Sequence, residues 1–178
     1  MRARDTLAYV EGNTHDGWYI APRNRPSPNF RSWYDIVSFE DGDALSYNQG
    51  LLPCALQAAR AIGLSTATSP EQAIANYRAL YLPDGGFFPL SQRKRFLCVD
   101  ALVGDALAAV EFGQPLLEDA PVRQHYATLL ARAKTPYGFK VTCAEDGSLL
   151  PAEARAAHGY LNPFFTKYPA GRRPRLSA

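Results

Sequence analysis

Four carboxylates lie close together in the first quarter of the chain, beside several aromatic and amide side chains. Asp35, Glu40, Asp41 and Asp43 fall within nine positions. Such mixtures bind sugars, because aromatic planes stack on ring faces while amides and carboxylates hydrogen-bond to hydroxyl groups. The segment therefore indicates a carbohydrate site, and its aromatic and amide residues are Trp33, Tyr34, Phe39, Tyr47, Asn48 and Gln49.

Hydrolysis of a glycosidic bond needs two carboxyl groups, one that protonates the leaving oxygen and one that acts on water or on carbon. We take Glu40, Asp41 and Asp43 as the candidate catalytic residues, and this segment could supply one member of the pair. A purely structural interpretation of the same residues is also open. Asp41 with Gly42 suits a turn, Asp43 suits a helix N-terminus through the helix dipole, and Asn48 suits a cap.

Motifs for other common chemistries are missing from the sequence, including GxGxxG, GxxxxGK[ST], GxSxG and HExxH. The three histidines, His15, His125 and His158, are isolated from one another. A lone histidine on a helix, such as His125, is more often packed or at the surface than bound to a metal. We therefore expect neither a cofactor nor a metal.

The composition is that of a folded globular chain. Its 178 residues are 47% hydrophobic, and the formal net charge of +2 gives no basic surface for nucleic acid. No apolar run approaches the roughly 20 residues that a membrane helix needs. Cys54, Cys98 and Cys143 are widely spaced and odd in number, which favours reduced thiols over a disulfide framework. We expect a cytoplasmic protein with no nucleic-acid or membrane partner.

The first 44 residues predict an irregular or β segment, in which TLAYV and GWYIA pair across EGNTHD. A helix follows from Leu45, with apolar residues at helical spacing and Gly63 as its stop. Pro53 leaves two readings of this helix, because proline lacks the N–H that interior positions need. The helix either begins near Gln49 or Gly50, or begins earlier and bends at Pro53. In both cases Tyr47, Asn48 and Gln49 lie near its N-terminal end.

Three more helices are predicted before residue 134. Ser69, Pro70 and Gln72 form a helix start, and VDALVGDALAAVEFG places Leu102, Leu107 and Val110 on a buried side. The last helix has Asp119 as its cap and Val122, Tyr126, Leu129 and Leu130 as its apolar residues. The two helix pairs are offset by about 50 residues, which suggests stacked helical hairpins.

After residue 134, TPYGFKVTCAEDGSLL predicts a β-hairpin turned at Asp146 and Gly147, and a final helix is expected from Pro151 to about Tyr160. The predicted fold class is therefore mainly α. We expect one domain over residues 1–178, built from antiparallel helical hairpins over 45–134, with short β-hairpins in the N-terminal region and near 138–150.

RSWYDIVSFEDGDALSYNQGLLPCALQAARAIGL, DGGFFPLS and VDALVGDALAAVEFG together resemble the six-hairpin glycosidase superfamily, which includes amylo-α-1,6-glucosidase and debranching-type enzymes. The resemblance implies an (α/α) toroid with a sugar site in loops at its wide mouth. It places Trp33, Asp35, Tyr47, Asn48 and Gln49 against the sugar, and it adds Tyr137 and Phe139 as a stacking surface.

The chain departs from the family in length, since it accounts for about half of a six-hairpin ring. The expected fold is thus a partial toroid. An open half-ring exposes an apolar inner face, which predicts a homo-oligomer. The chain could also be a truncated or inactive member of the family.

Three functions stay open at this point. The first is a cofactor-free glycosidase that hydrolyses α-glucosidic oligosaccharides, and the second is a related protein that binds sugar without turnover. The alternative from another class is a helical-hairpin interaction or assembly protein, with the basic stretch GRRPR as a contact.

Overall fold

Five α-helices and three two-stranded sheets form the part of the chain that the computed structural model describes, residues 2–21, 39 and 41–150. Residues 2–21 and 41–150 belong to one compact unit, to which all that follows refers. Helices make up 46% of the described residues, which confirms a mainly helical fold. The bounds of the helices are α1 Ala3–Gly12, α2 Ser46–Ala61, α3 Pro70–Ala79, α4 Val103–Phe112 and α5 Asp119–Arg132.

Each sheet consists of two short antiparallel strands. β1 (Thr14–His15) pairs with β2 (Trp18–Tyr19), and β4 (Lys134–Thr135) pairs with β5 (Gly138–Phe139). Both are local hairpins. β3 (Leu97–Cys98) instead pairs with the distant β6 (Thr142–Cys143).

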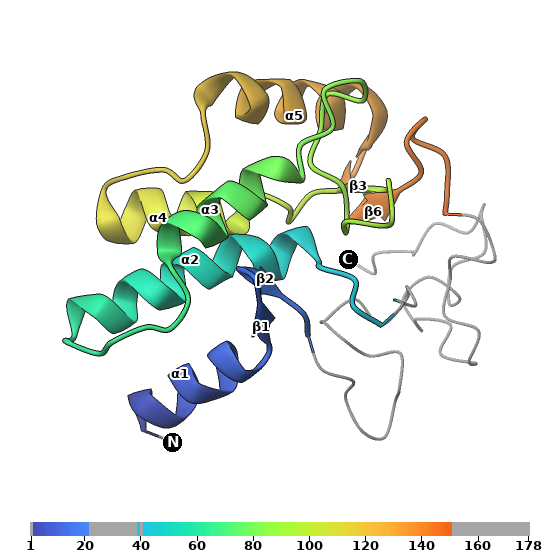
Figure 1. The fold of residues 1–178 in the computed structure, drawn as a ribbon. Coiled ribbons are helices and arrows are strands. Elements are labelled where there is room, and N and C mark those ends of the chain that lie inside the picture. The colour runs from blue at the N-terminus through green and yellow to red at the C-terminus, as the bar shows by residue number, and fades with distance from the viewer. Residues whose placement is uncertain (1, 22–38, 40, 151–178) are drawn as a thin grey trace, which may run out of the picture. The chain divides into compact units, whose positions relative to one another are not determined.

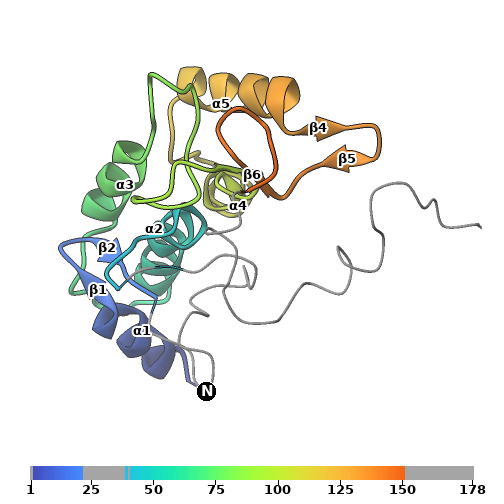
Figure 2. The same cartoon turned by 90° about the vertical axis from the view of Figure 1, so that its right-hand side faces the viewer.

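The helices are arranged in two layers. α2 and α3 form an antiparallel hairpin (Figure 1), and α2 makes extensive contacts with both α3 and α4. Seen from the side, α1, α3 and α5 follow one another around an outer arc, with α2 and α4 inside it (Figure 2). One helical hairpin, α2 with α3, is therefore present, whereas a second stacked hairpin and a toroid stay predictions.

The start and stop signals around the first helical hairpin act as expected. α2 is followed by Gly63 with φ +78°, a left-handed conformation that glycine adopts readily. The Ser69 hydroxyl caps α3 by accepting a hydrogen bond from the Gln72 N–H at 3.4 Å, and Pro70 is its first residue. α2 begins at Ser46, so Pro53 lies inside the helix.

The strand expected at TLAYV is wrong, because these residues belong to α1. Asp5 accepts a hydrogen bond from the Arg2 N–H at 3.1 Å, which stabilises the first turn of α1. Leu7 and Val10, three residues apart, pack against Leu52 and other buried residues of α2 and α3. The hairpin of this region forms instead between β1 and β2, inside the stretch that was expected to be its loop and second strand.

The buried sides that were expected for α4 and α5 are partly wrong. Leu107 and Val110 are 38% and 79% exposed, while Gly104, Asp105 and Ala108 are the buried residues of α4. Burial of Asp105 is compensated, since its Oδ1 accepts hydrogen bonds from the N–H groups of Leu116 at 2.7 Å and Leu117 at 2.8 Å.

In α5, Leu129 is buried as expected, but Tyr126 and Leu130 are 48% and 54% exposed. The N-cap is Glu118 rather than Asp119. The Asp119 carboxylate instead pairs with Arg123 at 2.8 Å, one helical turn away.

The turn at Asp146 and Gly147 is confirmed, with the Gly147 N–H donating to the Ala144 carbonyl at 2.9 Å. The hairpin predicted around this turn is wrong, because β6, which precedes the turn, pairs with β3, and residues 148–150 form no strand. Sequence patterns report strand-forming segments better than they report distant partners. The helix expected from residue 151 lies outside the described residues.

Among the described residues, two groups of buried side chains help to hold these elements together. One joins Phe87, Leu97, Leu129, Ala133 and Cys143, and the other joins Leu52, Leu56 and Ala73. All three cysteines are free thiols and buried. In the described part of the chain, no helix combines the length and apolar character needed to cross a membrane.

Candidate functional site

The predicted sugar site falls partly outside the described residues. Trp33, Asp35 and Glu40 are not described, so their predicted roles stay predictions. The structure places the other six candidates, Asp41, Asp43, Tyr47, Asn48, Gln49 and Tyr137, in different surroundings.

Asp43 is fully buried and binds a neighbouring loop. Its Oδ2 accepts a hydrogen bond from the Ser91 hydroxyl at 2.6 Å, and its Oδ1 accepts one from the Arg93 N–H at 3.1 Å. Burial raises the pKa of this carboxyl, against the opposing effect of those hydrogen bonds. These contacts give Asp43 a structural role, that of fixing the 91–94 loop beside the start of α2.

Gln49 is also fully buried, and its amide joins three elements. Nε2 donates to the carbonyl oxygens of Gly17 at 2.9 Å and Ala73 at 3.1 Å, while Oε1 accepts from the Tyr19 N–H at 3.0 Å. The side chain thus fastens α2 to the β1–β2 hairpin and to α3. Its polar atoms already have backbone partners, so these contacts give no support to a role in binding sugar.

Asp41 and Tyr47 lie two residues before Asp43 and Gln49, respectively. Asp41 is exposed, and its carbonyl oxygen accepts a hydrogen bond from Arg93 Nη1 at 3.2 Å. Tyr47 is half-buried in the first turn of α2. Of the two described candidate acids, Asp41 is the one that a substrate could reach.

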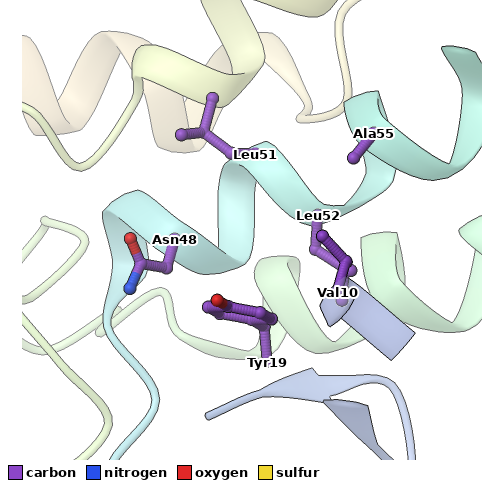
Figure 3. A pocket seen from close by; sticks show the side chains of 6 residues that line it. All are labelled: Val10, Tyr19, Asn48, Leu51, Leu52 and Ala55. Carbon is purple, nitrogen blue, oxygen red and sulfur yellow. The ribbon is translucent and has the colours of Figure 1, made fainter. Parts of the chain in front are cut away.

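Asn48 lies in a pocket between α1, β2 and α2, with a volume of about 200 Å³. Among the described lining residues Tyr19 is the aromatic one, and those other than Tyr19 and Asn48 are apolar. In Figure 3 the Tyr19 ring is seen nearly edge-on beneath α2, with Asn48 on one side and Val10 and Leu52 on the other. The lining residues in the described part are Val10, Tyr19, Asn48, Leu51, Leu52 and Ala55.

The chemistry of this pocket is that of a small binding site. Asn48 supplies an amide that can both donate and accept hydrogen bonds. Burial raises the pKa of the Tyr19 phenol, with a further contribution from Tyr9, so Tyr19 stays protonated at neutral pH. No carboxylate is among the described lining residues. The arrangement can bind a small ring with one apolar face and one polar edge.

The sequence pattern identified Asn48 but missed Tyr19 and Val10. Tyr19 belongs to the aromatic pair in GWYIA, a signal that was available, yet the pattern assigned it only to a strand. Val10 was missed because TLAYV was assigned to a strand and not to α1.

Tyr137 lies in a different part of the molecule from Asn48. It is 91% exposed at the tip of the β4–β5 hairpin, which follows α5 and extends away from the helices (Figure 2). The structure therefore does not bring Tyr137 to the pocket on α2.

His125 is fully buried on α5, and its Nδ1 accepts a hydrogen bond from the Phe88 N–H at 3.1 Å. Burial lowers the pKa of this imidazole to about 4. Within residues 2–21, 39 and 41–150, no group of three or more His, Cys, Asp or Glu side chains could hold a metal ion. His125 is thus a packed histidine in a helical core.

No protein-family model, curated protein or solved structure matches this chain. Its function is therefore inferred from the residues and the geometry of the pocket and of the buried polar groups.

Proposed function

We propose that this protein binds carbohydrate, with one sugar ring in the pocket lined by Tyr19 and Asn48. The proposal rests on one observation: a tyrosine ring and an amide group line the same pocket beside α2. An aromatic face packs on the C–H face of a sugar ring, and an amide bonds neighbouring hydroxyls. Pockets for drug-sized ligands usually enclose about 300–1,000 Å³, so about 200 Å³ suits a single ring.

The resemblance to six-hairpin glycosidases suggests an α-glucosidic oligosaccharide as the ligand class. One glucosyl unit would occupy the pocket, and the rest of the oligosaccharide would extend beyond it. No cofactor is needed for this binding.

Titration of the protein with maltose and maltotriose, followed by calorimetry and by NMR shifts of the α2 amides, tests the proposal. We expect saturable binding with a Kd of about 1 mM or tighter. Asn48→Ala should weaken binding about fivefold, since one hydrogen bond contributes about 1 kcal/mol. Gln57→Ala, on the same helix but outside the pocket lining, is the matched control and should bind as the wild type does. Absence of binding by either sugar, or equal affinities for all three proteins, would contradict the proposal.

Hydrolysis is the second candidate function, favoured by the exposure of Asp41. The same sugars and aryl α-glucosides, incubated with wild type and Asp41→Asn, separate the two functions. Turnover lost in the variant would make the protein a glycosidase, with Asp41 as one of its two carboxyl groups. Binding without turnover in both proteins would favour a sugar-binding module.

A further inference from the structure

One type of turn occurs three times in the described chain, each time after a helix of the outer layer. In each turn one residue pairs in antiparallel fashion with the residue five positions later: Thr14 with Tyr19, Leu82 with Phe87, and Lys134 with Phe139. We call them turn 1 (14–19), turn 2 (82–87) and turn 3 (134–139). They follow α1, α3 and α5.

Turn 1 is seated on α3, the next outer helix. Asn76 Nδ2 donates a hydrogen bond to the Asp16 carbonyl oxygen at 2.8 Å, and Gln72 Nε2 donates to Asn76 Oδ1 at 3.0 Å. Gly17 lies against the same two side chains, so that an added Cβ would be only 2.8 Å from Gln72 Cγ. A glutamine and an asparagine four residues apart therefore form the seat.

Turn 2 is seated on α5 by a similar pair of side chains, which contact the fifth residue of the turn where those of α3 contact the fourth residue of turn 1. The Thr128 hydroxyl donates a hydrogen bond to the Gly86 carbonyl oxygen at 3.0 Å, and a Cβ added at Gly86 would be 2.9 Å from Gln124 Cγ. Gln124 and Thr128 follow Gln72 and Asn76 by 52 residues each, and turn 3 follows turn 2 by the same 52 residues. Turn 2 follows turn 1 by 68 residues, so the 52-residue spacing holds for the two seats and for turns 2 and 3.

Turn 3 has the same length and spacing as turn 2 but no described helix against it. Unlike turn 2, it contains a second strand pair, Thr135 with Gly138, and the Thr135 hydroxyl donates a hydrogen bond to the Gly138 carbonyl oxygen at 3.1 Å. Gly138 corresponds to Gly86, and no described atom lies within 4 Å of a Cβ added there. Phe139 is 48% exposed, whereas its counterpart Phe87 is fully buried. The hairpin extends beyond α5 in Figure 2. Turn 3 is therefore a docking element whose seat is missing from the described part.

We infer that turn 3 docks on a further helix that carries glutamine and, four residues later, asparagine or threonine. The glutamine stem would cover Gly138, and the second side chain would donate a hydrogen bond to a carbonyl oxygen of the turn. A second copy of the described part is not the partner, because its two helices with this pair already seat turns 1 and 2. The inference is independent of sugar binding.

A peptide that copies the known seat tests the inference. The peptide TATSPEQAIANYRALY (residues 66–81) is titrated into the ¹⁵N-labelled full chain, and the amide signals are followed by NMR. We expect saturable shifts of the signals of residues 134–140. A peptide with alanine at the Gln72 and Asn76 positions should bind at least about fivefold more weakly, which corresponds to one hydrogen bond of about 1 kcal/mol.

Two variants of the protein sharpen the result. Gly138→Ala places a methyl group where the glutamine stem should lie and should abolish the shifts, whereas Tyr137→Gly introduces the residue found at the same position of turn 2 and should leave them intact. Strand pairing of residues 134 and 139 is checked in both variants by contacts between their protons. The inference is overturned if residues 134–140 do not shift, if both peptides act equally, or if the shifts arise from self-association of the chain.

Discussion

Gln49 and His125 show how single buried polar side chains hold the helical layers together. The Gln49 amide bonds backbone groups of the β1–β2 hairpin and of α3, and the His125 imidazole bonds the backbone after turn 2. Both side chains are fully buried. A buried backbone group that loses its partner costs about 1–3 kcal/mol, so these two residues should control stability more than any exposed residue does.

Gln49→Leu should lower the free energy of unfolding by about 2–4 kcal/mol, because Gly17, Ala73 and Tyr19 each lose a hydrogen-bond partner. Urea denaturation followed by circular dichroism measures the change. Gln57→Leu, half-buried on the same helix, should stay within about 0.5 kcal/mol of wild type. Equal effects of the two substitutions would show that the Gln49 hydrogen bonds contribute little.

His125 should make the fold sensitive to acid. Its Nδ1 accepts a hydrogen bond, so the neutral ring carries its proton on Nε2, which is buried without a partner among the described atoms. The folded pKa of about 4 lies below the ordinary 6.5. Because the unfolded chain binds the proton more readily, stability is full above pH 6.5 and falls as the pH drops toward 4.

Between pH 7.5 and pH 5 we expect the protonation of His125 to lower the free energy of unfolding by about 2 kcal/mol. Denaturation of wild type and His125→Gln at both pH values isolates it, because glutamine can accept the Phe88 hydrogen bond but does not titrate. The difference in stability between the two proteins should shift by that amount. A pH profile shared by wild type and variant would exclude His125 as the cause.

At the scale of elements, the inner helices approach each other through glycines. A Cβ added at Gly104 of α4 would lie about 2 Å from the carbonyl carbon and oxygen of Gly50 in α2. Cys54 Sγ lies 3.3 Å from the Gly104 carbonyl oxygen across the same contact. This close approach explains why α4 buries its small residues and exposes Leu107 and Val110.

Gly104→Ala should destabilise the protein by about 1–3 kcal/mol despite the higher helix propensity of alanine, because the added methyl group meets backbone that cannot move aside. Thermal unfolding measures the effect. Gly12→Ala is the control, since a Cβ at Gly12 has no described atom within 4 Å. It should be neutral or stabilising by up to about 1 kcal/mol. If Gly104→Ala were more stable than wild type, α2 and α4 would have to lie farther apart than the Gly104–Gly50 approach indicates.

At the scale of the whole molecule, the outward face of α4 carries exposed apolar side chains. Val103 and Leu107 are 36% and 38% exposed, and Val110 is 79% exposed. Their spacing of four and three residues places them on one face of the helix. Contiguous apolar surface of this kind favours association, and the homo-oligomer expected from the sequence stays a prediction that can be tested at this face.

Light scattering after size-exclusion chromatography should give a mass above the 19.6 kDa of one chain at micromolar concentration. Val110→Glu introduces a charge on the exposed face and should shift the protein toward the monomer. Asp119→Lys, at the exposed start of α5, should leave the mass unchanged. A stable wild-type monomer would contradict the prediction.

The sequence by itself determined the local structure of most elements. Ser69, Pro70 and Gly63 mark helix ends through their own backbone and side-chain preferences, and helical periodicity located α2 to α5. Such signals depend on neighbours within a few positions. TLAYV was the exception, because five residues are too few to separate helical from strand periodicity.

Only the tertiary structure decided which of those residues reach a ligand. The carboxylate of Asp43 and the amide of Gln49 look equally suited to sugar binding in the sequence, yet residues 24 to 50 positions away occupy their polar atoms. Asn48, next to Gln49, points instead to the pocket with Tyr19. Successive residues of a helix point about 100° apart, so packing of α1 and α3 against α2 determines which of them is buried and which can bind.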